Sequence, residues 1–281
     1  MIKIAVMIQA HKNFKQLQAL IESLVDENIY VFIHIDKKNE TLYKELKKYY
    51  NKDERIIVID NRVSVNWSGL SQIRATLNIM KEVYDHKIDF DRILLISGED
   101  YLLKTKKYLI DFFTKYKEYE FIEYKPIVRY KWRIKHYNFF TENKFNRSFF
   151  IRFMQKILRI IQNMLFISRN NLKNKELYKG SQWFNITGEA LKYIIENGIL
   201  LDEFKYTACS DEHYFQIILL NSKFKDRVID NNLRYIIWED NENSPKYLEY
   251  EDLLYAKKTD NIFARKVSEE LVLKLKKGNK F

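Results

Sequence analysis

Residues 2–36 decide the fold, because they place two apolar runs on either side of a helix-like segment. The runs are "IKIAVMIQ" (2–9) and "YVFIHID" (30–36), and the segment near 13–27 separates them. The alternation continues with helix-like segments near 40–50 and 69–84 and with the runs "RIIVID" (55–60) and "RILLIS" (92–97). Short β-branched runs separated by helices predict βαβ units and an α/β fold, with a mainly parallel central sheet flanked by helices.

The length and composition are those of a soluble globular protein with one large domain or two small ones. Of 281 residues, 46% are hydrophobic and 31% charged, and 6 Gly and 2 Pro leave no room for a disordered linker. The single cysteine, Cys209, excludes an internal disulfide framework and fits a reducing compartment. No apolar run reaches the ~18 residues of a membrane span. The N-terminus reads directly as a buried strand, so we expect a cytoplasmic protein.

The charge points to an anionic partner. The formal net charge is +11, and a basic, aromatic-rich segment occupies residues 125–175. Within it, "FFIRFMQKILRIIQNMLF" (149–166) has apolar residues at helical spacing with basic residues between them. Two interpretations stay open for residues 148–166: a core helix with a solvated edge, or a helix that lies on an anionic membrane surface.

In parallel sheets, ligands bind beyond the carboxyl ends of the strands. The residues that follow the predicted strands are His11, Asp36 and the segment "SGED" (97–100). Glu99 and Asp100 are candidate metal ligands, but their spacing is adjacent rather than alternate, and the metal signature is weak. The chain has no glycine-rich phosphate loop, so the sequence predicts neither a P-loop nor a dinucleotide site.

The segment "SDEH" (210–213) precedes the apolar run "YFQIILL" and allows two interpretations. Ser210 is a good helix N-cap, and acids are favoured in a first helical turn. Alternatively, Glu212 is a general base at the start of that helix. The segment "FARK" (263–266) is similarly ambiguous, because its two cations suit either a solvated helix start or a clamp for a phosphate pair.

Eight blocks in sequential order resemble the core-2/I-branching N-acetylglucosaminyltransferase and peptide O-xylosyltransferase family, which has a GT-A-like fold. The blocks are "AVMIQAHKN", "VFIHIDKK", "VNWSGLSQIRATLNIM", "ILLISGEDYLLKT", "GSQWFNIT", "SDEHYFQIILLNS", "VIDNNLRYIIW" and "IFARK". The resemblance covers nearly the whole length except residues 125–175. It implies a single glycosyltransferase domain over 1–281, with a nucleotide-sugar-binding half (1–124), a basic insertion (125–179) and a catalytic, diphosphate-binding half (180–281).

The resemblance also implies roles for individual residues. Glu212 matches the catalytic base, and the donor diphosphate is expected at Arg265, Lys266 and Lys246. The uridine is expected at His11 and Asp36. Residues that line the donor sugar or the acceptor are expected in the blocks that contain Glu99, Asp100, Gln182 and Trp183. Some relatives carry an acid at the Gln182 position, which leaves the donor sugar open.

The expected activity is therefore inverting, metal-independent transfer of a sugar from a UDP-sugar to a hydroxyl of a saccharide acceptor. No cofactor or metal is required, and the acceptor is an oligosaccharide or a lipid-linked saccharide, presented in the latter case at the inner face of the cell membrane. Two alternatives remain. The first is a nucleic-acid-binding protein that uses residues 125–175, and the second is a metal-dependent transferase that uses Glu99 and Asp100.

Overall fold

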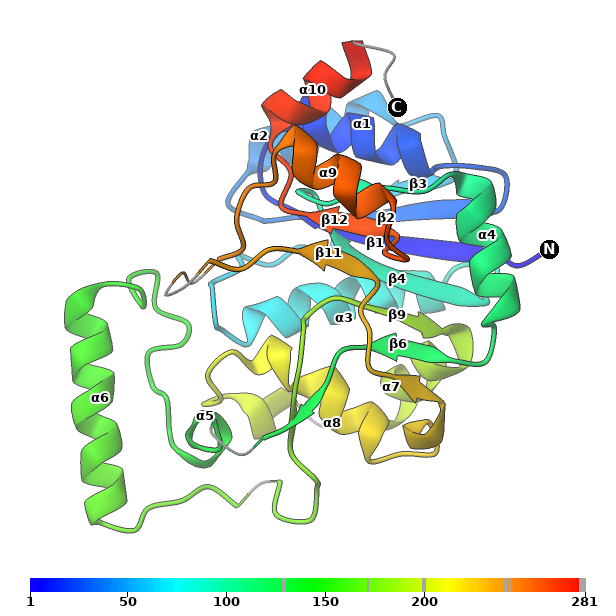
Figure 1. Cartoon of the computed structure of the whole chain (residues 1–281). Coiled ribbons are helices and arrows are strands. Elements are labelled where there is room, and N and C mark those ends of the chain that lie inside the picture. Colours follow the sequence, from blue (N-terminus) through cyan, green and yellow to red (C-terminus); the bar gives the residue numbers. More distant parts are fainter. Residues whose placement is uncertain (128–129, 171, 199–200, 240–241, 243, 278–281) are drawn as a thin grey trace.

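The computed structural model describes residues 1–127, 130–170, 172–198, 201–239, 242 and 244–277. In this part of the chain the central sheet has seven strands in the order β10-β6-β9-β4-β1-β2-β3 (Figure 1). All neighbouring pairs are parallel except those of β9, which runs antiparallel to both β4 and β6. The predicted, mainly parallel α/β sheet is confirmed. Its strands are β1 (Ile4–Ala10), β2 (Ile29–Ile35), β3 (Ile56–Val58), β4 (Arg92–Ser97), β6 (Glu120–Ile122), β9 (Phe184–Thr187) and β10 (Val228–Ile229).

Helices cover both faces of the sheet (Figure 1). Side chains alternate along each strand, so Ala5 and Met7 of β1 pack on one face while Val6 and Ile8 pack on the other. The first face is covered by α3, α7 and α8, and the second by α1, α2 and α4. Burial on both faces explains why these strands read as continuous apolar runs. The helices are α1 (Phe14–Leu24), α2 (Glu40–Tyr49), α3 (Ser71–Tyr84), α4 (Lys106–Lys115), α7 (Gly188–Asn197) and α8 (Tyr214–Leu220), with 3₁₀ turns η1 (Leu201–Phe204), η2 (Ser210–Glu212) and η3 (Lys225–Arg227).

A second, small sheet brings the C-terminal part of the chain to the end of β4. It consists of β11 (Arg234–Ile236), β12 (Phe263–Arg265) and β5 (Tyr101–Leu102). Because β12 runs antiparallel to β5 with Ala264 opposite Tyr101, the next residue, Arg265, arrives beside Asp100. Helices α9 (Tyr250–Lys257) and α10 (Glu269–Lys277) pack against this sheet in a separate apolar cluster.

The basic insertion leaves the body of the molecule through one short pair of strands. β7 (Lys125–Pro126) and β8 (Tyr178–Lys179) are antiparallel, and between them lie α5 (Trp132–Lys135) and α6 (Phe149–Met164). Figure 1 shows α6 at one side of the molecule, away from the central sheet. The predicted helix at 149–166 is thus present, and it does not form part of the main core.

Candidate active site

Glu212 lies in the 3₁₀ turn η2, directly before α8. Its backbone is fixed at two points: its N–H donates to the carbonyl of Cys209 (3.0 Å), and its carbonyl accepts from the N–H of Gly180 (2.8 Å). The carboxylate is about one-third exposed. Its Oε2 accepts from Nη1 of Arg133 at 2.6 Å and lies 3.5 Å from Nζ of Lys179. Both cations therefore hold the same carboxylate oxygen.

The structure corrects the expected helix cap at Ser210. His213 precedes the first residue of α8, and no side chain caps this helix. Ser210 Oγ is instead buried without a hydrogen-bond partner among the described residues, as is Oδ1 of Asp211. Burial, with the neighbouring Glu212 charge second, raises the pKa of Asp211 to about 7. The two adjacent acids thus differ: both line one pocket, but Glu212 is a partly exposed carboxylate paired with cations, while Asp211 is buried.

Arg265 is held from behind by a buried carboxylate. Asp100 is fully buried, and its Oδ1 lies 3.0 Å from Nη1 of Arg265 while its Oδ2 lies 3.5 Å from Nε of Arg234. Burial lowers the pKa of Arg234 to about 10. Asp100 is therefore enclosed between two guanidinium groups, and the structure places it behind the pocket rather than among the described residues that line it.

Glu99 is the carboxylate partner of Lys266, as Asp100 is of Arg265. Its carboxylate lies 3.0 Å from Nζ of Lys12 and 3.8 Å from Nζ of Lys266, and it accepts a hydrogen bond from the hydroxyl of Tyr247. Burial alone would raise the pKa of Glu99, but the hydrogen bonds from Tyr247 and Lys12 hold it below its ordinary value. Both acids of "SGED" thus have protein cations as partners.

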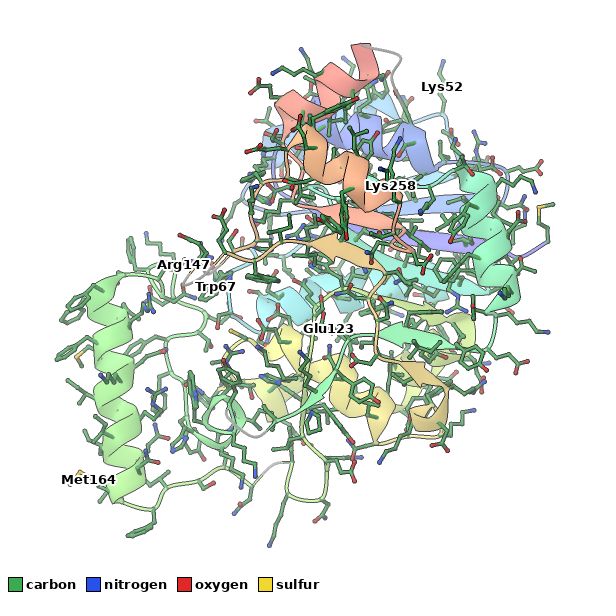
Figure 2. All side chains as sticks on the ribbon, in the orientation of Figure 1. Lys52, Trp67, Glu123, Arg147, Met164 and Lys258 are labelled. Atoms are coloured by element: carbon green, nitrogen blue, oxygen red, sulfur yellow. The ribbon has the colours of Figure 1, made fainter. Side chains whose placement is uncertain are left out.

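Positive charge exceeds negative charge around Lys266. Burial lowers its pKa, and although Glu99 opposes this change, Arg265, Lys12 and Arg147 lower it further. Arg147 belongs to the insertion and stacks over the ring of Trp67, 4.5 Å from its centroid. In Figure 2 both labels lie where the insertion meets the body of the molecule. A bound anion would relieve this repulsion between cations.

Gln182 has a contact from the main sheet and Trp183 has one from the small sheet. Nε2 of Gln182 donates to Oε1 of Gln9 at 2.8 Å, which fixes the orientation of its amide. The guanidinium of Arg265 lies over the ring of Trp183, 4.6 Å from its centroid. The "GSQWF" block and the "FARK" block, about 80 residues apart in the sequence, therefore meet in the fold.

One pocket of about 410 Å³ brings five of the predicted residues together. Glu212, Arg265, Lys266, Gln182 and Trp183 all line it. Trp67 and Arg147 line it as well, so the insertion contributes to its wall. Another cavity, of about 450 Å³, lies within the insertion beside Lys131 and Arg169 and contains none of the predicted site residues. The first pocket is therefore the candidate active site.

Three predicted donor-binding residues lie outside the described lining of this pocket. His11 and Asp36 follow the adjacent parallel strands β1 and β2, and the N–H of Asp36 donates to Ala10 O at 2.9 Å. Burial lowers the pKa of His11, and the charges of Glu99 and Lys266 also act on it. Lys246 lies 3.3 Å from the carboxylate of Asp252.

Several residues in or beside the pocket are not predicted by the sequence: Lys179 and Glu123 line it, and Arg133 contacts Glu212 without lining it. Arg133 and Lys179, which hold Glu212, come from the insertion, where many basic residues look alike in the sequence. Glu123 lines the pocket, and burial raises the pKa of its carboxyl group. The only available signal was the density of aromatic and basic residues at 125–140, and that signal does not single out Arg133.

Comparisons with known proteins show which family the chain belongs to. The family model "Branch: Core-2/I-Branching enzyme" matches residues 4–261. Xylosyltransferase 2 of Rattus norvegicus is 24% identical over 250 residues, which cover 85% of this chain and 27% of the relative. Xylosyltransferase of Ciona intestinalis is 23% identical over 244 residues, which cover 84% and 27%. The chain thus spans about a quarter of the length of these curated relatives.

Among solved structures, 4-diphosphocytidyl-2C-methyl-D-erythritol synthase from Anaerococcus prevotii DSM 20548 aligns over 91% of this chain and 94% of its own. Its identity is 11% and its TM-score 0.35, a likeness that carries no argument about function. The fold rests instead on the family match and on the observed sheet, which together confirm the predicted GT-A-like architecture. Because the family model covers most of its length, this chain belongs to the core-2/I-branching enzyme family of glycosyltransferases.

Proposed function

We propose that the chain is an inverting, metal-independent glycosyltransferase. It moves a sugar of the N-acetylglucosamine or xylose type from a UDP-sugar to a hydroxyl of a saccharide acceptor. The observation that supports this most strongly is the shared pocket, where the carboxylate of Glu212 and the cations Arg265 and Lys266 line the same 410 Å³ space. Sugar transfer needs both: a proton acceptor for the hydroxyl, and stabilisation of the charge that grows on the leaving diphosphate.

The reaction assigns a separate task to each group. The acceptor oxygen attacks the anomeric carbon from the face opposite UDP, and the bond from that carbon to the β-phosphate oxygen breaks. The hydroxyl proton passes to Glu212. UDP leaves with an additional negative charge, which Arg265 and Lys266 stabilise by fixed charge and hydrogen bonds. Asp100 and Glu99 act indirectly, because they orient these two cations.

The ion pair of Glu212 is compatible with its role as a base. The contacts from Arg133 and Lys179 both go to Oε2. Oε1 has no hydrogen-bond partner among the described residues and is left to take the proton of the acceptor hydroxyl. Arg133 is then a positioning residue, because it holds the carboxylate without contacting the reacting atoms.

The donor would extend from this pocket toward the carboxyl ends of β1 and β2. We assign His11 and Asp36 to the uridine and Lys246, whose carbonyl accepts from the N–H of Lys266, to the diphosphate side. Gln182 and Trp183 would contact the donor sugar or the acceptor. The bond between Gln182 and Gln9 presents a fixed amide to the sugar hydroxyls.

A metal-dependent reaction through Glu99 and Asp100 is the alternative that the sequence raises. Both carboxylates already have protein cations as partners, Lys12 and Lys266 for Glu99 and Arg234 and Arg265 for Asp100. These cations would have to be displaced before a metal could bind. Transfer that persists in excess EDTA supports our assignment, and loss of transfer restored by a divalent ion supports the alternative.

The base is tested with Glu212→Gln. We expect this variant to bind UDP like the wild type but to lose transfer by about two or more orders of magnitude, because the amide cannot accept the proton. The measurement pairs transfer rates from UDP-sugars with thermal shifts by UDP. Glu45→Gln, at an exposed position of α2, is the matched control. Unchanged transfer by Glu212→Gln would contradict the assignment.

A further inference from the structure

Helix α6 exposes its apolar side to solvent. The side chains concerned, here called the α6 apolar face, are Phe149, Phe150, Phe153, Ile160, Ile161 and Met164. Phe149 is 86% exposed and Met164 72% exposed, and the rings of Phe149 and Phe153 stack on each other. Within the 16 residues of α6, only Gln162 is buried. Monomeric proteins rarely expose a contiguous apolar surface of this kind unless it binds something.

The orientation of α6 is the reverse of that of a core helix. Its polar residues contact the protein: Gln162 accepts from the N–H of Tyr137 at 2.7 Å, and Asn163 Oδ1 lies 2.8 Å from Nε2 of His136. Arg159 stacks over Trp132 at 4.3 Å. A surface helix normally buries its apolar stripe and exposes its polar side. The interpretation of α6 as a core helix is therefore wrong for this chain.

The charge around α6 has one sign. No Asp or Glu occurs between Glu142 and Glu176. Arg152 and Lys156 are exposed, lie four residues apart on the same side of the helix, and flank the apolar face. The basic residues of this interval are Lys144, Arg147, Arg152, Lys156, Arg159, Arg169, Lys173 and Lys175. This pattern of an apolar face beside cations is complementary to an anionic lipid surface.

We propose that α6 docks the protein onto an anionic membrane, with the α6 apolar face in the interfacial region and the flanking cations at the lipid headgroups. Across the described residues, no helix combines the length and the hydropathy needed to cross a bilayer, so the contact is peripheral. A second copy of the chain fits less well, because the two basic segments would repel each other. Nucleic acid fits less well too, because only Phe149, Phe150 and Phe153 of this face offer rings for base stacking, whereas Ile160, Ile161 and Met164 offer none.

The start of α6 adjoins the candidate active site. Ser148 caps the helix by accepting from the N–H of Ile151, and the preceding residue, Arg147, lines the pocket beside Trp67. Figure 2 shows Arg147 at this end of the helix and Met164 at the other. If the proposed function holds, a bilayer beneath α6 would present a lipid-linked saccharide close to the pocket. Docking itself is independent of that function.

The test is flotation of the full chain with vesicles of phosphatidylcholine, with and without phosphatidylglycerol. We expect binding to the anionic vesicles only, and weaker binding as salt is raised. Phe149→Ser combined with Phe153→Ser should reduce binding by roughly a hundredfold, because two exposed rings no longer enter the interface. Arg152→Gln combined with Lys156→Gln should reduce it by roughly tenfold or more.

Matched control variants distinguish binding through the α6 apolar face from non-specific association with vesicles. Leu254→Ser with Tyr255→Ser removes two exposed apolar side chains from α9, and Lys48→Gln with Lys52→Gln removes two exposed charges. Both should bind vesicles like the wild type. The UDP-induced thermal shift reports on the donor site separately, and we expect the α6 variants to retain it. Docking is overturned if the wild type does not float with anionic vesicles at low salt, or if the α6 variants float like the controls. The docking proposal is also overturned if the α6 variants bind vesicles normally but lose oligonucleotide binding or self-association.

Discussion

Asp211 and Glu212 are neighbours in the chain but lie in different surroundings. Glu212 faces the pocket and shares one oxygen with Arg133 and Lys179, whereas Asp211 is buried and its Oδ1 has no partner among the described residues. An enclosed carboxyl group takes up a proton more readily than one in water, and this applies to Asp211. The two adjacent acids therefore differ in exposure and in hydrogen-bond partners.

The raised pKa of Asp211 predicts that the stability of the folded chain falls as pH rises. The folded chain raises this pKa from 3.8 to about 7, so the folded state holds the proton more tightly than the unfolded state. The stabilisation from this protonated carboxyl group is complete below the pKa of Asp211 in the unfolded state, and it is lost as pH rises through about 7. Asp211→Asn has no such loss. We expect its melting temperature, relative to that of the wild type, to improve between about pH 5 and pH 8.

Thermal melts at several pH values check this prediction. Asp226→Asn, at an acid in η3 that lies away from the pocket, is the control and should keep a constant offset from the wild type. Parallel curves for Asp211→Asn and the wild type would show that the buried carboxyl does not titrate in this range.

Individual residues were predictable only where a motif singled them out. The "SDEH", "FARK" and "GSQWF" blocks led to Glu212, Arg265, Lys266, Gln182 and Trp183, and the structure brings these five side chains to one pocket. Their chemical roles stay predictions. Arg133 was not identifiable, because its importance depends on a 2.6 Å contact with a residue 79 positions later. Nothing local distinguishes it from Lys131 or Lys135.

At the scale of elements, Gly180 joins the insertion to the 3₁₀ turn η2, which contains Glu212. It follows β8, its N–H donates to the carbonyl of Glu212, and it passes close to the backbone of Glu123. A Cβ at this position would lie 1.7 Å from the carbonyl oxygen of Glu123, far inside van der Waals contact. Only glycine allows the approach, which explains the residue that opens the "GSQWF" block.

We therefore expect Gly180→Ala to destabilise the fold by about 2 kcal/mol or more, because backbone must move to relieve the clash. Transfer should fall as well, since the displaced segment carries the bond to Glu212. Denaturant unfolding measures the first effect and initial rates the second. Gly98→Ala is the comparison: its Cβ would meet the Cβ of Ala10 at 2.8 Å, a milder clash that should cost less. Equal losses for the two variants would contradict this interpretation of the junction.

Helix α6 shows what periodicity can and cannot predict. The apolar spacing of "FFIRFMQKILRIIQNMLF" predicted a helix, and the helix spans Phe149–Met164. Periodicity predicts that the helix has an apolar face, but it does not predict what that face packs against. That depends on whether the flanking loops fold the segment onto the core, and here they place it away from the sheet (Figure 1).

At the scale of the whole molecule, the parallel sheet was predictable because burial on both faces leaves continuous apolar runs. The position of β9 between β4 and β6, antiparallel to both, was not, because strand order depends on contacts between distant segments. The same limit applies to the pairing of β12 with β5, which delivers Arg265 to Asp100. The division into a donor-binding half, an insertion and a catalytic half stays a prediction.

The proposed reaction requires that the diphosphate of the donor binds at Arg265 and Lys266, opposite Glu212. Titration calorimetry of UDP with the wild type and with Arg265→Ala combined with Lys266→Ala tests this directly. Lys48→Ala with Lys52→Ala is the charge-matched control, and unliganded melts verify folding, since Asp100 retains Arg234 as a partner. We predict that the Arg265 and Lys266 pair of substitutions weakens UDP binding on the order of a hundredfold or more, while the control binds normally. Equal UDP affinity in a folded double variant would contradict the account.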